Sequence, residues 1–364
     1  MKTSRNLFFR FHIDTPLLVA LLLLCSIGLL VLYSASDQKV EIVLRQSIRI
    51  GVGVLGMLII AQIPMRTILR WTPWVFGLGI VLLIAVMFFG YTGKGAQRWL
   101  DLRFLKFQPS EIMKIAVPMM VAWYLNDKPV PPSLFQIIVG LILIAVPVVL
   151  IARQPDLGTA ILVGTAGFYV LFLAGMRWRY LAVTGLLGVI GAPLLWYVMK
   201  DYQKQRILTM FNPEKDPLGA GYHIIQSKIA IGSGGLFGKG WLNGTQSQLG
   251  FIPERTTDFI FAVFCEEFGF LGVLVLITLY VFIIVRCLYM AREAQGTFAH
   301  LLCGSLALTF FTYVFVNMGM VSGQLPVVGV PLPLISYGGT SLVTLLLGFG
   351  LVMSAYTHRD LIAR

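Results

Sequence analysis

Ten long runs of apolar side chains follow one another along the chain, separated by polar or proline-containing segments. They cover about residues 16–34, 46–63, 72–90, 111–125, 135–151, 158–175, 180–199, 259–286, 301–321 and 334–356. A membrane-crossing helix needs about 20 apolar residues, and a helix satisfies its own backbone hydrogen bonds in lipid. The pattern predicts an all-α integral membrane protein, with ten transmembrane helices in a single polytopic domain over residues 1–364.

One segment differs because it is both long and polar. Residues 200–258 separate the seventh and eighth apolar runs, and we expect them to form one large extracytoplasmic loop. Within it, residues 222–231 (YHIIQSKIAI) mix polar and apolar side chains, as a short interfacial helix does. The glycine-rich stretch 232–240 fails the spacing of a nucleotide-binding loop, because Ser233 and Gly240 stand where Gly and Ser or Thr are needed. The sequence therefore predicts no ATP site.

The composition excludes several classes of protein. Hydrophobic residues make up 57% of the chain and charged residues only 12%, whereas soluble domains carry about 25% charged residues. A soluble enzyme, a disordered chain and a secreted disulfide scaffold are excluded. The four cysteines lie in or beside apolar runs with no metal-binding spacing, so they are predicted to be small core residues.

The net charge of +12 comes from Lys and Arg in the segments between apolar runs, which favours anionic lipid headgroups over nucleic acid as the partner. With the N-terminus inside, the cytoplasmic segments hold twelve Lys and Arg and the opposite short loops eight. This predicts both termini in the cytoplasm and a periplasmic 200–258 loop. Cations nevertheless gather on the outer face, in the 91–110 loop with Arg98 and in the long loop with Lys239 and Arg255. They are either ordinary solvated loop residues or a site for a phosphate-bearing lipid.

Ionisable residues beside the apolar runs are candidates for function, because charge at the centre of a bilayer costs about 2.5–3.5 kcal/mol on insertion scales. Glu111 and Lys114 are three residues apart on one helical face. They form either a structural ion pair or a pair in which Glu111 holds Lys114 toward a substrate phosphate. Asp156 is either a helix N-cap or, beside Arg153, a carboxylate that orders a substrate or a cation.

Asp258 is the strongest candidate for a catalytic group. It stands where the polar loop meets the apolar run that begins at Phe259, and Arg255 precedes it. It is either a helix cap or a half-desolvated carboxylate that accepts a proton near neutral pH. Glu266 is expected to support the site by pairing with polar groups of other helices.

Seven motifs together resemble the SEDS family, the shape, elongation, division and sporulation proteins. They are 94–100 (KGAQRWL), 108–111 (QPSE), 154–159 (QPDLGT), 216–222 (DPLGAGY), 253–259 (PERTTDF), 328–333 (VGVPLP) and 336–339 (SYGG). The resemblance covers nearly the whole chain. It implies a multi-pass protein of the bacterial inner membrane that polymerises lipid II into peptidoglycan glycan strands for lateral elongation and rod shape.

The resemblance also implies partners and site residues. The partners are a class B penicillin-binding protein, which crosslinks the strands, and other membrane proteins of the elongation complex. The catalytic carboxylate of the family corresponds to Asp258. The resemblance also implies functional roles for Arg98, Glu111, Lys114 and Asp156.

The residues suit this chemistry, since lipid II already carries a pyrophosphate leaving group. One general base on the acceptor 4-hydroxyl, with positive charge near the pyrophosphate, is sufficient. Attack opposite the α-linked pyrophosphate inverts the anomeric centre and forms a β-1,4 bond. Asp258 is the candidate base, and Arg98, Lys114 and a divalent cation (Mg²⁺ or Mn²⁺) are candidate stabilisers of the leaving group. Two alternatives remain open, a lipid II flippase and a non-catalytic scaffold of the elongation complex.

Overall fold

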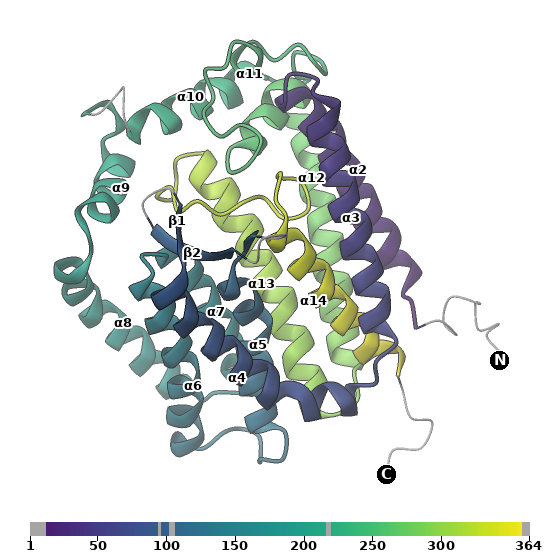
Figure 1. Ribbon diagram of the computed structural model, residues 1–364, viewed down its shortest axis with the longest axis vertical. Coiled ribbons are helices and arrows are strands. Elements are labelled where there is room, and N and C mark those ends of the chain that lie inside the picture. The colour runs from purple at the N-terminus through teal and green to yellow at the C-terminus, as the bar shows by residue number, and fades with distance from the viewer. Residues whose placement is uncertain (1–11, 94–95, 102–105, 216–219, 359–364) are drawn as a thin grey trace.

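The computed structural model describes residues 12–93, 96–101, 106–215 and 220–358, and helices dominate it (Figure 1). The first half of the chain forms α2 (Thr15–Ala35), α3 (Val40–Ala61), α4 (Met65–Phe89), α5 (Pro109–Leu125), α6 (Leu134–Arg153), α7 (Leu157–Leu173) and α8 (Trp178–Val198). The second half forms α9 (Asp201–Phe211), a 3-10 turn (Pro213–Lys215), α10 (Ala220–Ser233), α11 (Thr245–Gln248), α12 (Ile260–Glu293), α13 (Thr297–Val321) and α14 (Thr340–Thr357).

Seven of the described helices are long and apolar enough to cross a membrane, namely α2, α3, α4, α6, α12, α13 and α14. α7 and the part of α8 from Trp178 to Gly191 are apolar but shorter. α5 has 17 residues and carries the charged Glu111 and Lys114. The predicted class, a helical membrane protein, is confirmed, and the count of ten crossings stays a prediction.

The helices pack around two apolar cores. One core lies among α2, α3, α12, α13 and α14, and the other among α4, α5, α6, α7 and the start of α13. Glycines allow some of the closest approaches, since a Cβ on Gly350 of α14 would lie 2.6 Å from the carbonyl oxygen of Met57 in α3. α8 and α9 lie along one edge of the bundle in Figure 1, and most of the described side chains of α8 are exposed.

The two ends of the described chain meet on one side of the bundle. The ring of His12, just before α2, stacks on the ring of His358, just after α14, with centroids 3.7 Å apart. Asp14 caps the start of α2 and pairs with Arg286 of α12 at 2.5 Å. The start of the first described helix and the end of the last therefore lie on the same side of the bundle.

The glycine-rich stretch 232–240 has a structural purpose, because it packs against a break in α12. Gly269 has φ +60°, which interrupts the helix. The break frees the carbonyl groups of Glu266 and Glu267, which accept hydrogen bonds from the amides of Lys239 and Gly240, both at 3.0 Å. In return, the amides of Phe270 and Leu271 donate to the carbonyls of Gly235 and Leu236, at 2.9 and 3.1 Å. The stretch thus satisfies backbone groups that the break would leave unpaired.

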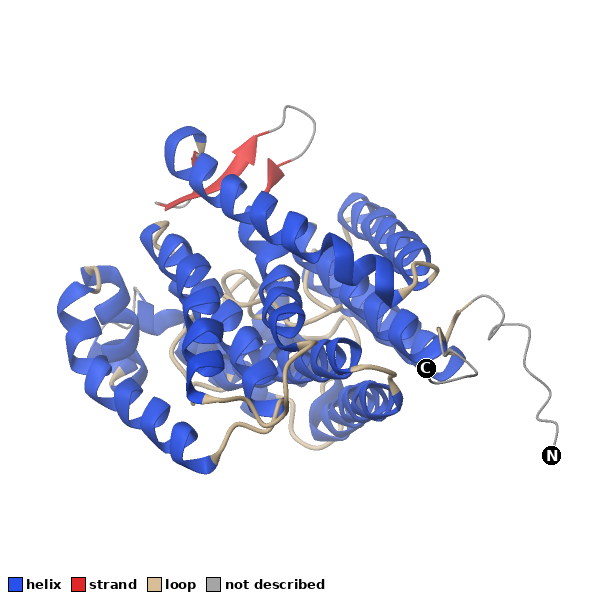
Figure 2. Ribbon diagram, turned by 90° about the horizontal axis from the view of Figure 1, so that it is seen from below, coloured by secondary structure: helices blue, strands red, loops and turns tan. Residues whose placement is uncertain are grey.

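The two polar segments that carry the candidate cations, 91–110 and 200–258, contain more regular structure than the sequence suggests. Residues 200–258 include α9, α10 and α11, and α10 covers the predicted interfacial helix. The 91–110 loop contains a small antiparallel sheet of β1 (Tyr91–Gly93), β2 (Ala96–Asp101) and β3 (Lys106–Phe107), in the order β1-β2-β3. Figure 2 shows these strands at the edge of the helical bundle. Both loops therefore hold their side chains on defined elements.

Candidate active site around Asp258

The segment that contains Asp258 is fixed by three consecutive backbone carbonyl groups. The carbonyls of Thr256, Thr257 and Asp258 accept hydrogen bonds, in that order, from the amide of Tyr337 (2.8 Å), the hydroxyl of Ser336 (2.6 Å) and the side-chain amide of Asn317 (2.9 Å). All three donors come from the last part of the chain. The segment before α12 is therefore held by residues about 60 to 80 positions later.

Asp258 is not the N-cap residue of α12. That position belongs to Phe259, whose side chain makes no capping hydrogen bond. The side chain of Asp258 is half-buried, and its Oδ2 faces Gly329, where an added Cβ would lie 3.5 Å away. Gly329 has φ +79°, a backbone conformation that favours glycine. The loop around Gly329 thus lies directly against the carboxylate.

Arg98, Gln108 and Asp156 form a second polar cluster. Arg98 lies in β2, and its guanidinium is 3.7 Å from Asp156 and donates to the carbonyl of Pro155. Asp156 also accepts hydrogen bonds from Gln108 at 3.1 Å and from the backbone amide of Thr159 at 3.3 Å. Asp156 is therefore the N-cap of α7 and, at the same time, the partner of Arg98. The N-cap interpretation of Asp156 is therefore confirmed, and its role in ordering a substrate or a cation stays a prediction.

Close backbone contacts connect this cluster to Asp258. A Cβ on Gly158, two residues after Asp156, would lie 3.2 Å from the carbonyl oxygen of Val328. Val328 precedes Gly329, which faces the carboxylate of Asp258. The motifs at 154–159, 253–259 and 328–333 therefore converge on one region.

Glu111 and Lys114 form a buried ion pair within α5. Their charged atoms are 2.7 Å apart, and the side chains are 5% and 9% exposed. The ammonium of Lys114 also lies 4.9 Å from the centre of the Tyr313 ring on α13. A small cavity of about 30 Å³ adjoins all three residues. The pair thus links α5 to α13 inside the bundle.

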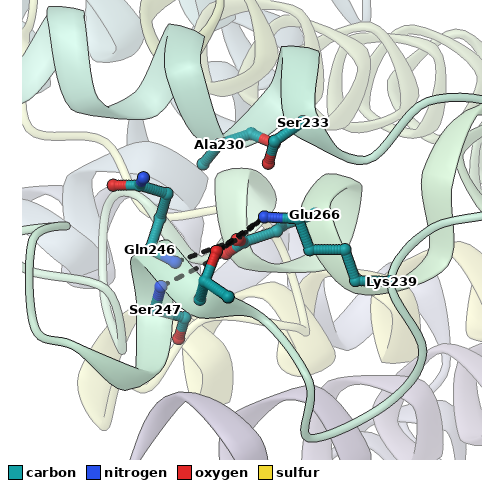
Figure 3. Close-up of polar contacts among 7 residues, drawn as sticks. Ala230, Ser233, Lys239, Gln246, Ser247 and Glu266 are labelled. Carbon is teal, nitrogen blue, oxygen red and sulfur yellow. Dashed lines mark hydrogen bonds and ion pairs between the residues drawn. The ribbon is translucent and has the colours of Figure 1, made fainter.

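Lys239 is paired with Glu266, as Figure 3 shows. The distance is 2.8 Å, and the carboxylate of Glu266 is fully buried (0% exposed). Glu266 also accepts hydrogen bonds from the backbone amides of Gln246 and Ser247, at 2.9 and 3.2 Å. The charge of Glu266 is therefore satisfied by the loop that it anchors to α12.

Arg255, three residues before Asp258, reaches the segment that follows α2. Its guanidinium pairs with Asp37 at 2.5 Å and donates to the carbonyl of Ser247. Arg255 thus connects the 253–259 motif to the segment after α2.

The comparisons with known proteins agree with this arrangement of motifs. Residues 15–361 match the profile of the FtsW, RodA and SpoVE proteins, described as cell cycle proteins. The chain belongs to this SEDS family. It is 54% identical to the peptidoglycan glycosyltransferase MrdB of Escherichia coli K12, over 97% of this chain and 96% of the relative. It is 36% identical to a probable peptidoglycan glycosyltransferase FtsW of Thiomicrospira cyclica, over 94% of this chain and 91% of the relative.

Solved structures of SEDS proteins share the fold. One belongs to a peptidoglycan synthase complex described for its coordination of polymerization and crosslinking. The TM-score is 0.83 at 33% identity, over 95% of this chain and 99% of the other. The rod shape determining protein RodA of Thermus thermophilus has a TM-score of 0.73 at 29% identity, over 95% of this chain and 98% of the other. The predicted family is therefore confirmed.

The structure brings some of the predicted site residues together. Asp258, Asp156 and Arg98 lie in motifs that meet, and Arg98 pairs with Asp156. The other three cations, Lys239, Arg255 and Lys114, pair with Glu266, Asp37 and Glu111. Substrate contacts by these cations stay predictions.

Sequence reasoning attached no function to Asn317 and Gln108. Gln108 was visible within the QPSE motif, and Asn317 was visible only as a lone amide in an apolar run. Among the described residues, no group of three or more His, Cys, Asp or Glu side chains could hold a metal ion. The divalent cation, Mg²⁺ or Mn²⁺, therefore stays a prediction.

Proposed function

We propose that this protein is a peptidoglycan glycosyltransferase that polymerises lipid II into β-1,4-linked glycan strands for lateral wall elongation. The observation that carries the proposal is the convergence of three SEDS motifs on the half-buried carboxylate of Asp258. The relatives named as peptidoglycan glycosyltransferases, which align over nearly the whole chain, support the same reaction. A non-catalytic scaffold would not need the carboxylate of Asp258 at all.

In the proposed reaction, Asp258 is the general base. It removes the proton from the acceptor 4-hydroxyl while that oxygen attacks C1 of the donor sugar. The bond between C1 and the pyrophosphate oxygen breaks, and the electron pair leaves with the polyprenyl pyrophosphate. Attack from the opposite face converts the α-linkage of the donor into a β-1,4 bond. A positioned base contributes about 10²–10⁴-fold to the rate.

Arg98 is the cation best placed to meet the pyrophosphate. Its side chain is 31% exposed, and the motif that holds its partner Asp156 also contacts the loop facing Asp258. Lys114 is more deeply buried and pairs with Glu111. Stabilisation of negative charge on the leaving group by Arg98 is the second component of the mechanism.

We further propose the topology that this reaction requires. Ten helices cross the inner membrane of a bacterium, both termini are cytoplasmic, and the 200–258 segment and the active site face the periplasm. The meeting of the two described ends supports a common side for both termini, and the Lys and Arg count along the chain supports the cytoplasmic side. We also propose a class B penicillin-binding protein as partner, because one structural relative belongs to a complex that couples polymerization to crosslinking.

The test is glycan synthesis by the purified full-length protein. Lipid II is supplied in detergent micelles, with no membrane and therefore no ion gradient, and products are separated by size. The proposal predicts long glycan chains. A flippase or a scaffold would leave lipid II unpolymerised in this assay, even with the penicillin-binding partner added.

A further inference from the structure

Asn317 connects two loops through a single side chain. It lies near the end of α13 and is fully buried, at 0% exposure. Its Nδ2 donates to the carbonyl oxygen of Asp258 at 2.9 Å and to the carbonyl oxygen of Val330 at 2.7 Å. A side-chain amide nitrogen has two N–H donors, so both are used. Asn317 thus joins the segment before α12 to the loop before α14.

One of these two loops carries the carboxylate of Asp258, and the other carries the backbone that lies against it. Asp258 supplies the carboxylate itself, and Gly329, the residue before Val330, faces its Oδ2. The amide of Asn317 therefore sets the separation between the backbone that carries the carboxylate and the backbone that covers it.

We propose that Asn317 is a positioning residue for the carboxylate of Asp258. The inference rests on the proposed function. Displacing a catalytic group by about 1 Å can slow a reaction about 10²-fold, so the loss of this amide should reduce turnover. Binding of lipid II should change little, because Asn317 is buried and reaches only backbone carbonyls.

A purely structural role makes a different prediction, and α13 offers a matched control. Ser305 is also fully buried, and its hydroxyl donates to the carbonyl of Ala166 in α7 at 2.6 Å. This bond joins one helix to another, three turns from Asn317 along α13. Ser305→Ala removes a buried hydrogen bond of similar length without touching either loop.

The experiment compares Asn317→Ala, Ser305→Ala and wild type as full-length proteins, with lipid II in detergent. Rates are expressed per folded protein. We expect Asn317→Ala to lower kcat by about 10- to 100-fold and to keep KM for lipid II within about threefold. Ser305→Ala should keep kcat near that of wild type.

A second measurement remains informative if Asn317→Ala folds poorly. Asn317→Asp introduces a fully buried carboxyl that faces two carbonyl oxygens, so it should stay protonated and can donate to only one of the two loops. With one loop released, the half-buried carboxylate of Asp258 should become more hydrated, and the acid limb of the pH–rate profile should move to lower pH. Its position does not depend on how much protein is folded.

The inference is overturned if Asn317→Ala matches Ser305→Ala in kcat and the acid limb of Asn317→Asp stays in place. If wild-type protein makes no glycan, the proposed function fails instead. The two failures are therefore distinguishable.

Discussion

Replacing Glu111 with Gln removes one charge from the buried pair on α5 and leaves Lys114 without its carboxylate. The two charged atoms are 2.7 Å apart, and both side chains are less than a tenth exposed. Gln keeps the size of the side chain and a carbonyl acceptor. The substitution therefore isolates the loss of charge from the loss of volume.

The expected loss of stability follows from the burial of the pair. Removing one partner of a buried ion pair costs about 3–5 kcal/mol, because the other charge remains buried. The ring of Tyr313, 4.9 Å from the ammonium, stays in place and contributes about 0.5–2 kcal/mol. We therefore expect the free energy of unfolding to fall by about 3 kcal/mol, the lower end of the range.

The assay is equilibrium unfolding of the purified protein in mixed micelles. Glu41→Gln is the control, because Glu41 forms an exposed pair with Arg45 at 3.6 Å, with side chains 84% and 63% exposed. Such a pair contributes about 0.3–0.5 kcal/mol. The double variant Glu111→Gln/Lys114→Met should recover most of the loss, because it removes both buried charges. A loss for Glu111→Gln no larger than that for Glu41→Gln would refute the reasoning.

Three further predictions concern the pyrophosphate, the topology and pH. Arg98→Ala should raise KM for lipid II about tenfold or more, the effect of losing a charge-assisted contact, and should lower the free energy of unfolding by only about 0.2–1 kcal/mol. The control is Arg153→Ala, which removes an exposed cation nearby and should change neither quantity. Equal losses of stability and activity in Arg98→Ala would contradict the role of Arg98. For the topology, Asn243→Cys should react with an impermeant thiol reagent in intact cells, and Asp127→Cys should react only after the inner membrane is broken. All four native cysteines are buried, so they should add little background labelling. The reverse pattern would invert the topology. Burial lowers the pKa of His223, while Glu254 raises it and Arg206 lowers it further. The unfolded state therefore takes up the proton first, and stability should fall as the pH drops below about 6.5. Thermal scans of His223→Phe should show a weaker dependence of stability on pH, and an unchanged dependence would exclude His223 as its source.

Local spacing allowed part of the site to be predicted from the sequence. Glu111 and Lys114 are three residues apart on a helix, and the structure pairs them. Asp156 precedes an apolar run and caps the helix that forms there. In both cases, the deciding contacts are made within one turn of a helix, so the sequence contains the necessary information.

The remaining contacts depend on tertiary structure. Arg255 and its partner Asp37 are 218 residues apart, and Lys239 and Glu266 are 27 apart. No periodicity relates such positions, so the sequence could not show that these cations already have carboxylate partners. Likewise, the glycine-rich stretch is explained only by the break at Gly269, which the apolar run conceals.

The account rests most directly on the carboxylate of Asp258. Asp258→Asn keeps the size and polarity of the side chain, and Asp258 is not the N-cap residue of α12, so we expect folding to be little affected. The decisive measurement is the rate of glycan-chain formation from lipid II by purified Asp258→Asn protein, at the same folded concentration as wild type. The account predicts a rate at least about 100-fold below that of wild type, with unchanged thermal stability. A rate near that of wild type would contradict it and would move the general base to another residue, with Asp156 the next candidate.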